Sequence, residues 1–517
     1  MSSMVPVLAL VKSNWEAIED QPIIGKDVLE LLSSSMYVNP LSIYREYVQN
    51  AMDSIEEAIA LGSLAVNRGR IDIIIDAQNR QARIRDNGTG IPRNIFAKTL
   101  IALGASKKRG TKARGFRGVG RLAGLGYCKE LVFRSRAEGE KQVSELRWDC
   151  RRLKALLANS QVKLNVDGLI KDLVRIRHLT TDGFPARFFE VELNGIMRHS
   201  GDYLIDTRQV HDYLSQVAPV PFAPNFAFAK RIHDELSAHV SLGNILIYLN
   251  GSKTPIYRPH ADEFEIRRGV RDRFSEIKFL DIKDSDGHLA AKAWFLQHGY
   301  HGAIGSGALI KGLRLRSGNI QIGESNLLDE LFTESRFNSW VVGEIHVLDE
   351  RILPNGRRDH FEQNVYFNDL LNKLRPVASE LACCCRMSSL SRNAIRQFES
   401  LQVQVKSILS ILQQGAVSPV QSHKLKKQAI MILHRMDKAS SHPALTLEHR
   451  RKFTLIIKRL QHKLREEEVS KRRHRILKQM PSSQQKIWER FITLLYEYSP
   501  NKIAAKTLVD HILRRLQ

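Results

Sequence analysis

The sequence predicts an α+β fold in which helices lie on a mixed β-sheet, followed by a second α/β region and an all-helical end. Three observations predict it. Apolar residues recur at helical spacing over residues 40–61, and two alternating segments, 70–76 and 81–86, follow across a short polar turn. Beyond residue 377 the β-strand pattern disappears. We therefore expect helices layered on one face of the first sheet.

The first helix is predicted over residues 40–61 and ends at Gly62, which is a stop signal. The apolar positions that share its core side are Ile43, Tyr47, Val48, Ala51, Ile55 and Ile59. A second helix is expected from about Pro92 to Leu103, after the β-hairpin. Residues 102–127 are then too rich in Gly, Lys and Arg for an ordinary surface loop, which indicates a functional segment.

Later elements follow the same patterns. Strands are predicted at 130–137, 141–148 and 186–193, with a helix at 151–158. The proline-rich segment 218–226 marks a boundary. Beyond it, strand patterns with helices between them indicate a second α/β domain, and they cover residues 244–251, 288–296, 308–323 and 340–350. The expected domains are residues 1–217, 218–377 and 378–517, the last broken near Pro419, Pro443 and Pro481.

Composition limits the class of protein. The chain has 517 residues, of which 43% are hydrophobic, so it can form sizeable cores. No run of about 18 apolar residues exists, so no membrane span is expected. The formal charge is +24, and residues 381–517 hold 27 Lys and Arg against 9 Asp and Glu. The basic surface is therefore mainly C-terminal, which suggests contact with a polyanion, although excess charge also favours solubility.

The five cysteines fit a reducing compartment. Their number is odd, and none has the paired CxxC spacing of a zinc site. The run Cys383, Cys384 and Cys385 lies in an apolar-rich stretch, so we expect small buried helix residues there. The N-terminal residues lack the basic and extended apolar regions of a secretory signal, and we expect a cytoplasmic protein.

The first polar motif lies on the first helix. Glu46, Asn50 and Asp53 occur at positions i, i+4 and i+7, so they project from one face. A polar stripe on an amphipathic helix is common and by itself would usually be a solvated face.

Two further motifs follow along the chain. Asp86 begins the sequence Asp-Asn-Gly-Thr-Gly, where a carboxylate can accept a hydrogen bond from an amino group such as that of adenine. The two glycines of this sequence let the backbone approach a planar ligand, although the same residues also form ordinary turns. The stretch 115–120, Gly-Phe-Arg-Gly-Val-Gly, can surround phosphate oxygens with backbone N–H groups. In this order and spacing the three motifs are specific together.

These motifs resemble the GHKL superfamily, the Bergerat-fold ATPases that include Hsp90 chaperones, DNA gyrase B, MutL, MORC proteins and histidine kinases. The resemblance covers about 200 residues. Hsp90-like members are the most similar, because residues 45–55 match their N-box and residues 100–124 resemble their ATP lid and glycine hinge. The resemblance implies a Bergerat-fold ATP-binding domain at 1–217, a transducer-like domain at 218–377 and a basic helical region at 378–517.

The resemblance implies a role for each motif residue, with ATP and Mg²⁺ as ligands. Glu46 would orient and deprotonate the attacking water. Asn50 would be a Mg²⁺ ligand, and Asp53 would support the site. Asp86 would bind the adenine amino group, with Gly88 and Gly90 lining the base pocket.

The phosphates are expected at the glycine-rich stretch, whose implied contacts are Gly115, Gly118, Val119 and Gly120. Lys107 in the lid would assist them. Other cations of the lid compete for that role, namely Lys108, Arg109 and Lys112.

A second resemblance lies far downstream. Residues 352–364 resemble the middle-domain loop by which Hsp90-type proteins send an arginine to the γ-phosphate, and Arg358 occupies that place. Arginine suits this task because its fork meets phosphate oxygens bidentately. Arg357 is the neighbouring candidate, and the alternative is a basic surface turn paired with Asp359 and Glu362.

One family feature is missing. Many GHKL proteins carry a Gly-Thr pair on a late strand near the adenine, and residues 180–193 contain none. Thr180 or Thr181 is the expected substitute.

Three functions are compatible with these patterns. The first is an Hsp90-like ATPase whose lid and second domain close on ATP, acting as a homodimer on a protein client. The second is a nucleic-acid-associated ATPase of the MORC or MutL sort, favoured by the basic segments after residue 447. The third is a nucleotide-gated scaffold, for example in host defence, against which Glu46 argues.

Overall fold

The protein is described here from a computed structural model that places residues 39–102, 120–159, 166–198, 201–240, 242, 245–469, 477 and 479–515. The chain forms two compact units. One comprises Met1–Gln297, Ile304–Leu331 and Val341–Arg375, and the other His298–Ala303, Phe332–Trp340 and Pro376–Gln517. Helix α8 (Val365–Gln414) begins in the first unit and continues in the second.

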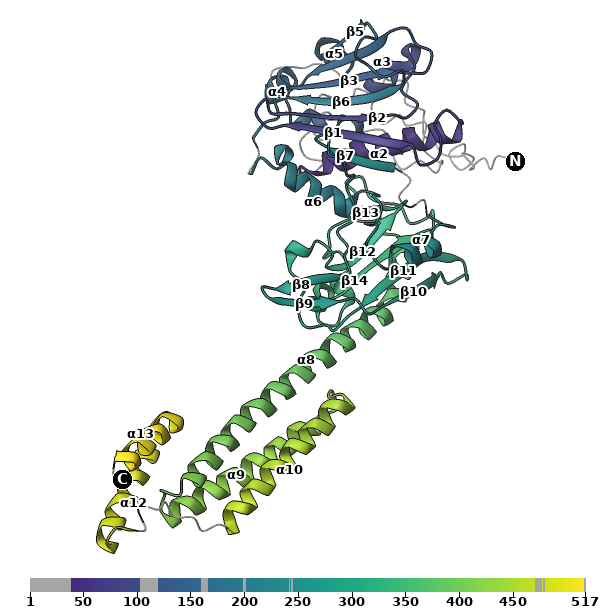
Figure 1. Ribbon diagram of the computed structural model, residues 1–517. Helices are drawn as coiled ribbons and strands as arrows, with labels where there is room; N and C mark the ends of the chain where they lie inside the picture. The colour runs from purple at the N-terminus through teal and green to yellow at the C-terminus, as the bar shows by residue number, and fades with distance from the viewer. Residues whose placement is uncertain are drawn as a thin grey trace, which may run out of the picture. The chain divides into compact units, whose positions relative to one another are not determined.

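The first sheet has seven strands in the order β5-β4-β3-β6-β2-β1-β7 (Figure 1). Their bounds are β1 Gly69–Asp76, β2 Gln81–Asp86, β3 Glu130–Arg136, β4 Val143–Asp149, β5 Val174–Leu179, β6 Phe188–Asn194 and β7 Ile245–Leu249. The predicted hairpin is confirmed, since β1 and β2 pair antiparallel with Ile73 opposite Ile84. The sheet is mixed because β7 pairs parallel with β1.

Strand β7 corrects one expectation. The sequence predicts residues 244–251 in the second domain because they follow the proline-rich boundary, but the strand extends the first sheet at its β1 edge. The pairing sets Ile71 opposite Ile247, and both side chains are fully buried. A boundary inferred from prolines cannot show which edge a later strand will join, because that is decided by backbone pairing across the fold.

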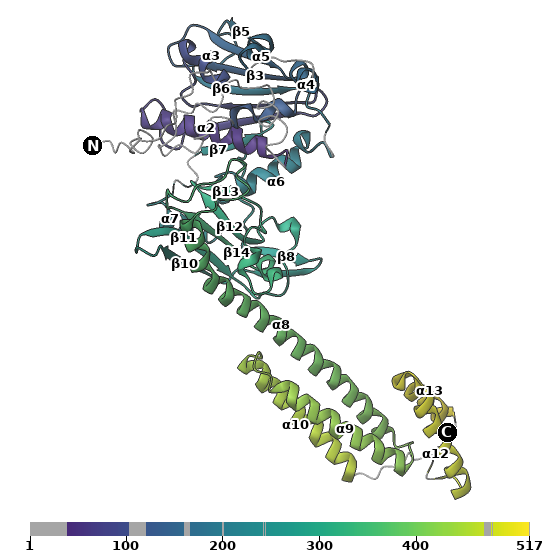
Figure 2. The ribbon, with the colours of Figure 1, turned by 180° about the vertical axis from the view of Figure 1, so that it is seen from behind.

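One face of this sheet is covered by helices, as predicted. They are α2 Ser42–Ala60, α3 Arg93–Ile101, α4 Cys150–Ala158, α5 Val166–Leu173 and α6 Thr207–Val217, with the short turns η2 Gly120–Gly126 and η3 Tyr203–Ile205. Helix α2 lies behind the strands in Figure 1 and in front of them in Figure 2. Alternation in β1 and β2 directs Ile71, Ile73 and Ile84 into the shared core.

The other face of the sheet carries a ladder of charges across neighbouring strands. Arg134 on β3 pairs with Glu145 on β4 at 2.6 Å and with Glu190 and Glu192 on β6 at 2.8 and 2.6 Å. Arg85 on β2 also pairs with Glu190, at 2.6 Å. The polar positions of the alternating strands therefore meet one another rather than a second layer.

The second sheet has the order β10-β11-β14-β12-β13. Its strands are β10 Glu276–Lys283, β11 Leu289–Gln297, β12 Gly312–Ser317, β13 Ile320–Ile322 and β14 Val342–Val347, and the pair β8 Glu263–Arg267 and β9 Val270–Arg273 stands apart. Helix α7 (Ala229–Leu236) precedes them. The connections between the strands hold only short 3₁₀ turns in the described residues, η4 Ser306–Ala308, η5 Asp329–Leu331 and η6 Ser335–Trp340. The α-helices expected between these strands are therefore not present there.

The C-terminal region is all-helical, as predicted. After α8 come α9 Pro419–Ser440, α10 Leu447–Val469, α12 Ser482–Tyr498 and α13 Lys502–Arg515. Their apolar faces form one core that includes Phe398, Leu433 and Ile492. Cys385 is buried, whereas Cys383 and Cys384 are exposed, because only one of three successive helix residues can face the core. Among the described helices, none combines the length and apolar character that a bilayer crossing needs.

Candidate nucleotide site

Helix α2 carries the three polar residues that the first motif singled out. Glu46 and Asp53 are buried, with 6% and 8% of their surface exposed, and Asn50 is half-buried. Apolar side chains such as Val48 and Ile55 are fully buried in the core and fix the rotation of the helix. The polar stripe is therefore turned inward, which excludes an ordinary solvated face.

The Glu46 carboxylate lies where two distant segments reach helix α2. A Cβ atom on Gly120 would lie only 2.5 Å from Glu46 Oε2, so a side chain at this position would displace the carboxylate. On the other side, Glu46 Oε1 is 3.5 Å from Nε of Arg358. It is also 3.6 Å from the guanidinium of Arg45. Within the described residues Oε1 accepts no hydrogen bond, so it keeps lone pairs for a water molecule.

Arg358 reaches Glu46 from a tight turn that follows strand β14. Its backbone is left-handed, with φ 56°, a conformation that non-glycine residues seldom adopt. Its N–H donates to the Asn355 carbonyl at 3.1 Å, and its carbonyl accepts from the Gly323 N–H at 3.0 Å. The Arg358 side chain is 11% exposed, so it is not a solvated surface residue.

Arg45 ties this turn to helix α2. Its guanidinium donates to the carbonyl oxygens of Arg357 and Arg358, at 2.9 and 3.4 Å. Arg45 is 6% exposed and directly precedes Glu46. Arg45 does not stand out in the sequence, because a charged residue beside a motif carries no spacing signal of its own.

Asp86 ends strand β2 and is buried, with 4% of its surface exposed. The N–H of Gly88 donates to its Oδ1 at 2.8 Å. Burial raises the pKa of Asp86 to about 7, even though the Gly88 hydrogen bond and the charge of Arg187 lower it. A buried carboxyl with one oxygen already bonded can offer its other oxygen to an amino group.

The turn after Asp86 packs directly on helix α2. A Cβ on Gly88 would lie 2.2 Å from Oγ of Ser54, and the N–H of Thr89 donates to that same Oγ at 3.1 Å. Gly90 has φ 68° and lies against the carbonyl of Arg136. Both glycines are thus required by close backbone approach, whatever else they line.

Helix α2 therefore links the two ends of the candidate site. Ser54 follows Glu46 by eight residues, which corresponds to about 12 Å along the helix axis. Gly120 and Arg358 meet the Glu46 end, and the Asp86 turn meets the Ser54 end. An elongated ligand with a base at one end and phosphates at the other suits this arrangement.

Arg187 belongs to residues 180–193, the stretch that lacks the Gly-Thr pair. It precedes β6, donates to the carbonyls of Asn87 at 3.4 Å and Ser63 at 2.9 Å, and its charge reaches Asp86. Thr180 instead follows edge strand β5, which strands β4, β3 and β6 separate from β2. The role of Thr180 or Thr181 as a substitute for the pair stays a prediction, whereas Arg187 is the residue of this stretch whose charge reaches Asp86.

Part of the glycine-rich prediction falls outside the described residues. These positions are Lys107, Gly115, Gly118 and Val119, together with the competing lid cations Lys108, Arg109 and Lys112. The residues on either side of this segment are tied together, because the Arg121 guanidinium donates to the carbonyls of Thr99 and Ala102.

Gln49 is a second residue that the motif search missed. It is 1% exposed, and neither its amide oxygen nor its amide nitrogen has a hydrogen-bond partner within the described residues. Such a buried amide is costly unless a ligand or water completes it. Its position three residues after Glu46, on the adjoining side of the helix, was the available signal.

The second sheet that carries Arg358 is held to helix α6 by buried charges. Glu344 on β14 pairs with Arg258 and, at 2.6 Å, with Arg316 on β12. Arg316 also donates to the carbonyl of Gln216 on α6 at 2.6 Å. Although burial opposes ionisation, the charges of Arg258 and Arg316 hold the pKa of Glu344 well below its usual range.

Another acidic cluster of the described residues lies on the turn between β10 and β11. Its oxygen and nitrogen ligands come from Asp284, Asp286 and His288, close enough together to hold a cation. However, Arg351 pairs with Asp284 at 2.6 Å, and Asp286 and His288 are exposed. The cluster is explained by these contacts and is not assigned to a metal.

Comparison with known proteins agrees with the geometry around α2. Residues 42–171 match the family described as histidine kinase-, DNA gyrase B-, and HSP90-like ATPase. Chaperone protein HtpG of Nitrobacter winogradskyi strain Nb-255 is 37% identical over 92 residues, covering 17% of this chain and 14% of that protein. HtpG of Escherichia coli K12 is 28% identical over 142 residues, covering 24% of this chain and 23% of that protein.

The chain thus spans less than a quarter of the length of these curated relatives. The matched residues include helix α2, the Asp86 turn and Gly120 of the candidate site, whereas the Arg358 turn lies outside them. Residues 42–171 therefore match the GHKL-type, Hsp90-like ATPase family model, and the distant similarity to HtpG agrees with closeness to its Hsp90-like members.

Proposed function

We propose that this protein is a Mg²⁺-dependent ATP hydrolase in which Glu46 is the general base. The observation that carries the proposal is the convergence of Gly120 and Arg358 on one buried carboxylate. A carboxylate that accepts no hydrogen bond through Oε1 can orient a water molecule and take its proton. A nearby arginine can stabilise the charge that develops on a transferred phosphoryl group.

The other motif residues receive roles in the same site. Asn50 would coordinate Mg²⁺, which when bound neutralises phosphate charge, and Asp53 would support that end of the helix. Asp86 would accept a hydrogen bond from the adenine amino group, with Gly88 and Gly90 beside the base. The phosphates would contact Gly115, Gly118, Val119 and Gly120, assisted by Lys107.

Three observations on the described residues fit ATP at this site. Gly120 brings its backbone next to the Glu46 carboxylate, where a side chain would displace that carboxylate, and a backbone cradle for phosphate requires such an approach. The buried Asp86 has one oxygen engaged by Gly88 and the other available. The unpartnered amide of Gln49 lies beside Glu46 on α2 and could bond a ligand or its water shell.

The ion pairs around Glu46 support a closure cycle. In the state described, Arg45 and Arg358 both face its Oε1. A triphosphate would compete for Arg358, so that nucleotide binding would exchange a carboxylate partner for a phosphate partner. We propose that this exchange couples slow hydrolysis to movement of the second sheet, in a cytoplasmic homodimer that acts on a protein client.

The first test replaces the proposed base. We expect Glu46→Ala to bind ATP with little change in affinity and to lose hydrolysis by about 100-fold or more, because general bases contribute about 100- to 10,000-fold. Asp53→Ala, a change of similar size on the same stripe, is the control and should keep a larger share of turnover. Nucleotide binding by calorimetry and phosphate release would both be measured. Normal hydrolysis by Glu46→Ala would remove the base assignment, and a wild type that binds but never hydrolyses would favour the scaffold function.

A nucleic-acid-associated ATPase is the second candidate, and helix α10 favours it. Among its described side chains, this helix exposes six basic ones to solvent, namely Arg451, Lys452, Lys458, Arg459, Lys463 and Arg465. Phosphate contacts of that kind make binding fall steeply with salt. Binding of a 20-base-pair duplex should then weaken as salt rises and should change the rate of ATP hydrolysis. Unchanged turnover with salt-insensitive binding would dismiss this candidate and leave the client-directed cycle.

A further inference from the structure

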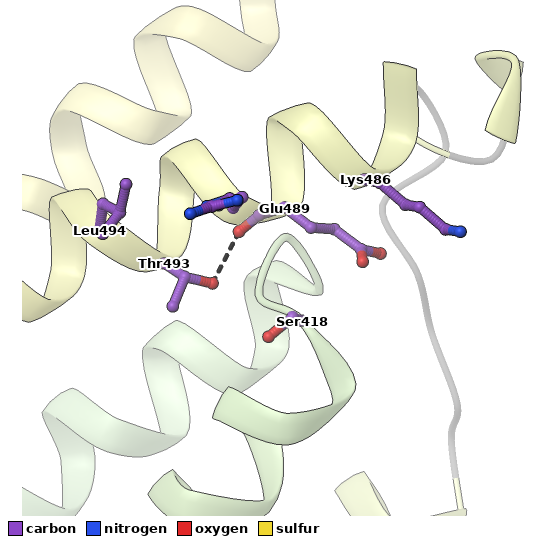
Figure 3. Close-up of a pocket in the computed structure, with 6 residues that line it drawn as sticks. Ser418, Lys486, Glu489, Thr493 and Leu494 are labelled. Atoms are coloured by element: carbon purple, nitrogen blue, oxygen red, sulfur yellow. Dashed lines mark hydrogen bonds between the residues drawn. The ribbon is translucent and has the colours of Figure 1, made fainter. Parts of the chain in front are cut away.

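A buried amide on helix α2 requires a polar partner more strongly than the open hollow of the C-terminal helices does. That hollow, of about 270 Å³, is lined by Ser418 at the start of α9 and by Lys486 and Arg490 on α12 (Figure 3). Both basic side chains are exposed, so water can solvate them without a ligand. The side chain of Gln49 is instead 1% exposed, and neither of its amide atoms has a hydrogen-bond partner in the part of the chain that the structure describes.

The helical period directs Gln49 between Arg45 and Glu46. Gln49 follows Arg45 by four residues and Glu46 by three, so its direction about the helix axis differs from theirs by about 40° and 60°, on opposite sides. Side chains on a helix lean toward its N-terminus, and Gln49 therefore leans back toward the turn that carries Glu46. The three side chains project from one side of α2.

The turn that carries Arg358 covers this side of the helix. Arg45 donates to two carbonyl groups of the turn, and Nε of Arg358 is 3.5 Å from Oε1 of Glu46. That Oε1 is buried and accepts no hydrogen bond within the described residues. Two unpartnered polar groups, the Gln49 amide and Glu46 Oε1, thus lie on successive turns of one buried helix side. One bridging water molecule would satisfy both.

We infer that Gln49 is a further catalytic residue, which holds the attacking water together with Glu46. The amide oxygen of Gln49 accepts one hydrogen bond from this water, and Oε1 of Glu46 accepts the other. The lone pair of the water oxygen is then directed away from both side chains, toward the γ-phosphorus. A glutamine amide suits this task because it orients an attacking water without taking its proton. The inference rests on the proposed function and adds a residue to the same site.

The hydrolytic step balances with these two groups. The water oxygen forms a bond to the γ-phosphorus, while the bond from that phosphorus to the β–γ bridging oxygen breaks and ADP leaves with the electron pair. The proton of the water passes to Glu46. Gln49 neither gains nor loses a proton, so its contribution to the rate is independent of pH.

A structural role for Gln49 makes the opposite prediction for stability. An amide kept for the fold is hydrogen-bonded within the protein, and its removal leaves its partner unbonded. Gln81 is such a case, because its amide nitrogen donates to Oδ1 of Asn194 at 2.6 Å and joins β2 to β6. An amide that is unpartnered in the fold and kept for the reaction costs stability, so an apolar replacement of the same length should stabilise the protein.

Gln49→Met keeps the length of the side chain and removes its amide. We expect a higher urea midpoint than wild type without nucleotide, and a kcat lower by about 10- to 100-fold, which is less than the loss of a base. The Kd for ATP should change by less than about threefold, and the shape of the pH profile of kcat should not change. Gln81→Met is the matched control and should keep turnover without a higher midpoint. Full turnover by Gln49→Met overturns the inference, as does a loss of turnover that comes with a lower midpoint, weaker ATP binding or a shifted pH profile.

A double variant tests whether the two residues share one water. Added to Glu46→Ala, Gln49→Met should lower the residual single-turnover rate by less than about threefold, because no water held by the base is left to orient. A further loss as large as the one in the wild-type background would show that Gln49 acts without Glu46 and would overturn the inference.

The wild-type protein in the same assays separates this inference from the proposed function. If the wild type and Gln49→Met hydrolyse ATP equally well, the proposed ATPase stands and the role of Gln49 fails. If the wild type binds ATP and does not hydrolyse it, the proposed function fails, and the role of Gln49 fails with it.

Discussion

At the scale of single residues, the site depends on where two carboxyl groups are buried. Glu46 is held between two guanidinium groups and a glycine, whereas Asp86 faces a backbone N–H and lies further from charge. The same residue class is thus placed in a cationic and in an apolar setting. Such a division suits a base near phosphates at one end and an acceptor for the uncharged adenine amino group at the other.

Asp86 predicts a pH dependence of nucleotide binding. Its pKa near 7 means that the carboxyl takes up a proton as pH falls below neutrality. If the ionised form accepts the amino group, the Kd for ATP should rise as pH falls from 8 to 5.5, at most about tenfold per pH unit. Calorimetric titrations across this range measure it, and Asp86→Asn should bind weakly with no such slope.

The raised pKa of Asp86 changes the stability of the fold with pH in the opposite direction to nucleotide affinity. Because the pKa of Asp86 in the folded protein lies above the ordinary value of 3.8, its contribution to folding is fully present below about pH 4. That contribution is lost as pH rises through about 7. For the binding prediction, a Kd for ATP that stays constant from pH 8 to 5.5 would show that protonation of Asp86 does not control ATP binding.

Arg358 predicts a split between turnover and affinity. Arg358→Ala should lower kcat by about 100-fold or more with less than a threefold change in Kd, since arginines that act on the transition state contribute about 1,000- to 100,000-fold. Arg357→Ala is the matched control, because its side chain is exposed and only its carbonyl contacts Arg45. If the two variants have equal turnover, Arg358 does not act on the phosphate and is only a turn residue that pairs with Glu46.

At the scale of elements, helix α2 organises the domain. Its apolar side joins the sheet, its polar side meets Gly120 and the Arg358 turn, and Ser54 receives the turn after Asp86. The 3.6-residue period made the helix predictable, and the period-2 alternation made the hairpin predictable. Neither period shows which residues from other segments will complete the polar side.

The contact between Gly88 and α2 predicts a steric effect. Gly88→Ala should destabilise the protein by roughly 1–3 kcal/mol, because the new Cβ would lie 2.2 Å from Oγ and 2.7 Å from the carbonyl carbon of Ser54. Gly307→Ala is the matched control, with open space around its Cβ. Urea unfolding of both variants measures the difference, and equal midpoints would show that the turn and helix can separate without cost.

At the scale of the whole molecule, the chain must bring the Arg358 turn to a helix more than 300 residues earlier. The buried group of Glu344, Arg258 and Arg316 joins strand β14 to strand β12, and Arg316 reaches the carbonyl of Gln216 at the end of α6. These residues are 1% to 2% exposed. Removal of one charge leaves the others buried without compensation, which is costly.

Glu344→Gln should therefore destabilise the protein by about 3–5 kcal/mol and reduce ATP turnover with it. Glu350→Gln, an exposed position on the same connection, is the control and should have little effect. The pKa of Glu344 is depressed in the folded protein, so its contribution is present above the ordinary carboxyl pKa and is lost as pH falls further. Thermal unfolding at pH 7 and pH 4 measures both effects, and a wild-type melting temperature for Glu344→Gln would refute this role.

The sequence by itself determined the local periods and the spacing of the three motifs. Helix α2, the β1–β2 hairpin and the proline-delimited C-terminal helices follow from side-chain alternation and turn residues, which act over a few positions. The sequence likewise indicated Glu46, Asp86 and Arg358, because the motifs that contain them are specific when they occur together. It also indicated an ATPase of the GHKL type before any fold was known.

Only the tertiary structure decided which segments meet. The parallel pairing of β7 with β1, the contact of Arg45 with the Arg358 turn and the place of Arg187 beside Asp86 have no local signature. Each depends on contacts between residues far apart along the chain. Backbone pairing and burial create those contacts after the elements form, so no window of sequence contains them.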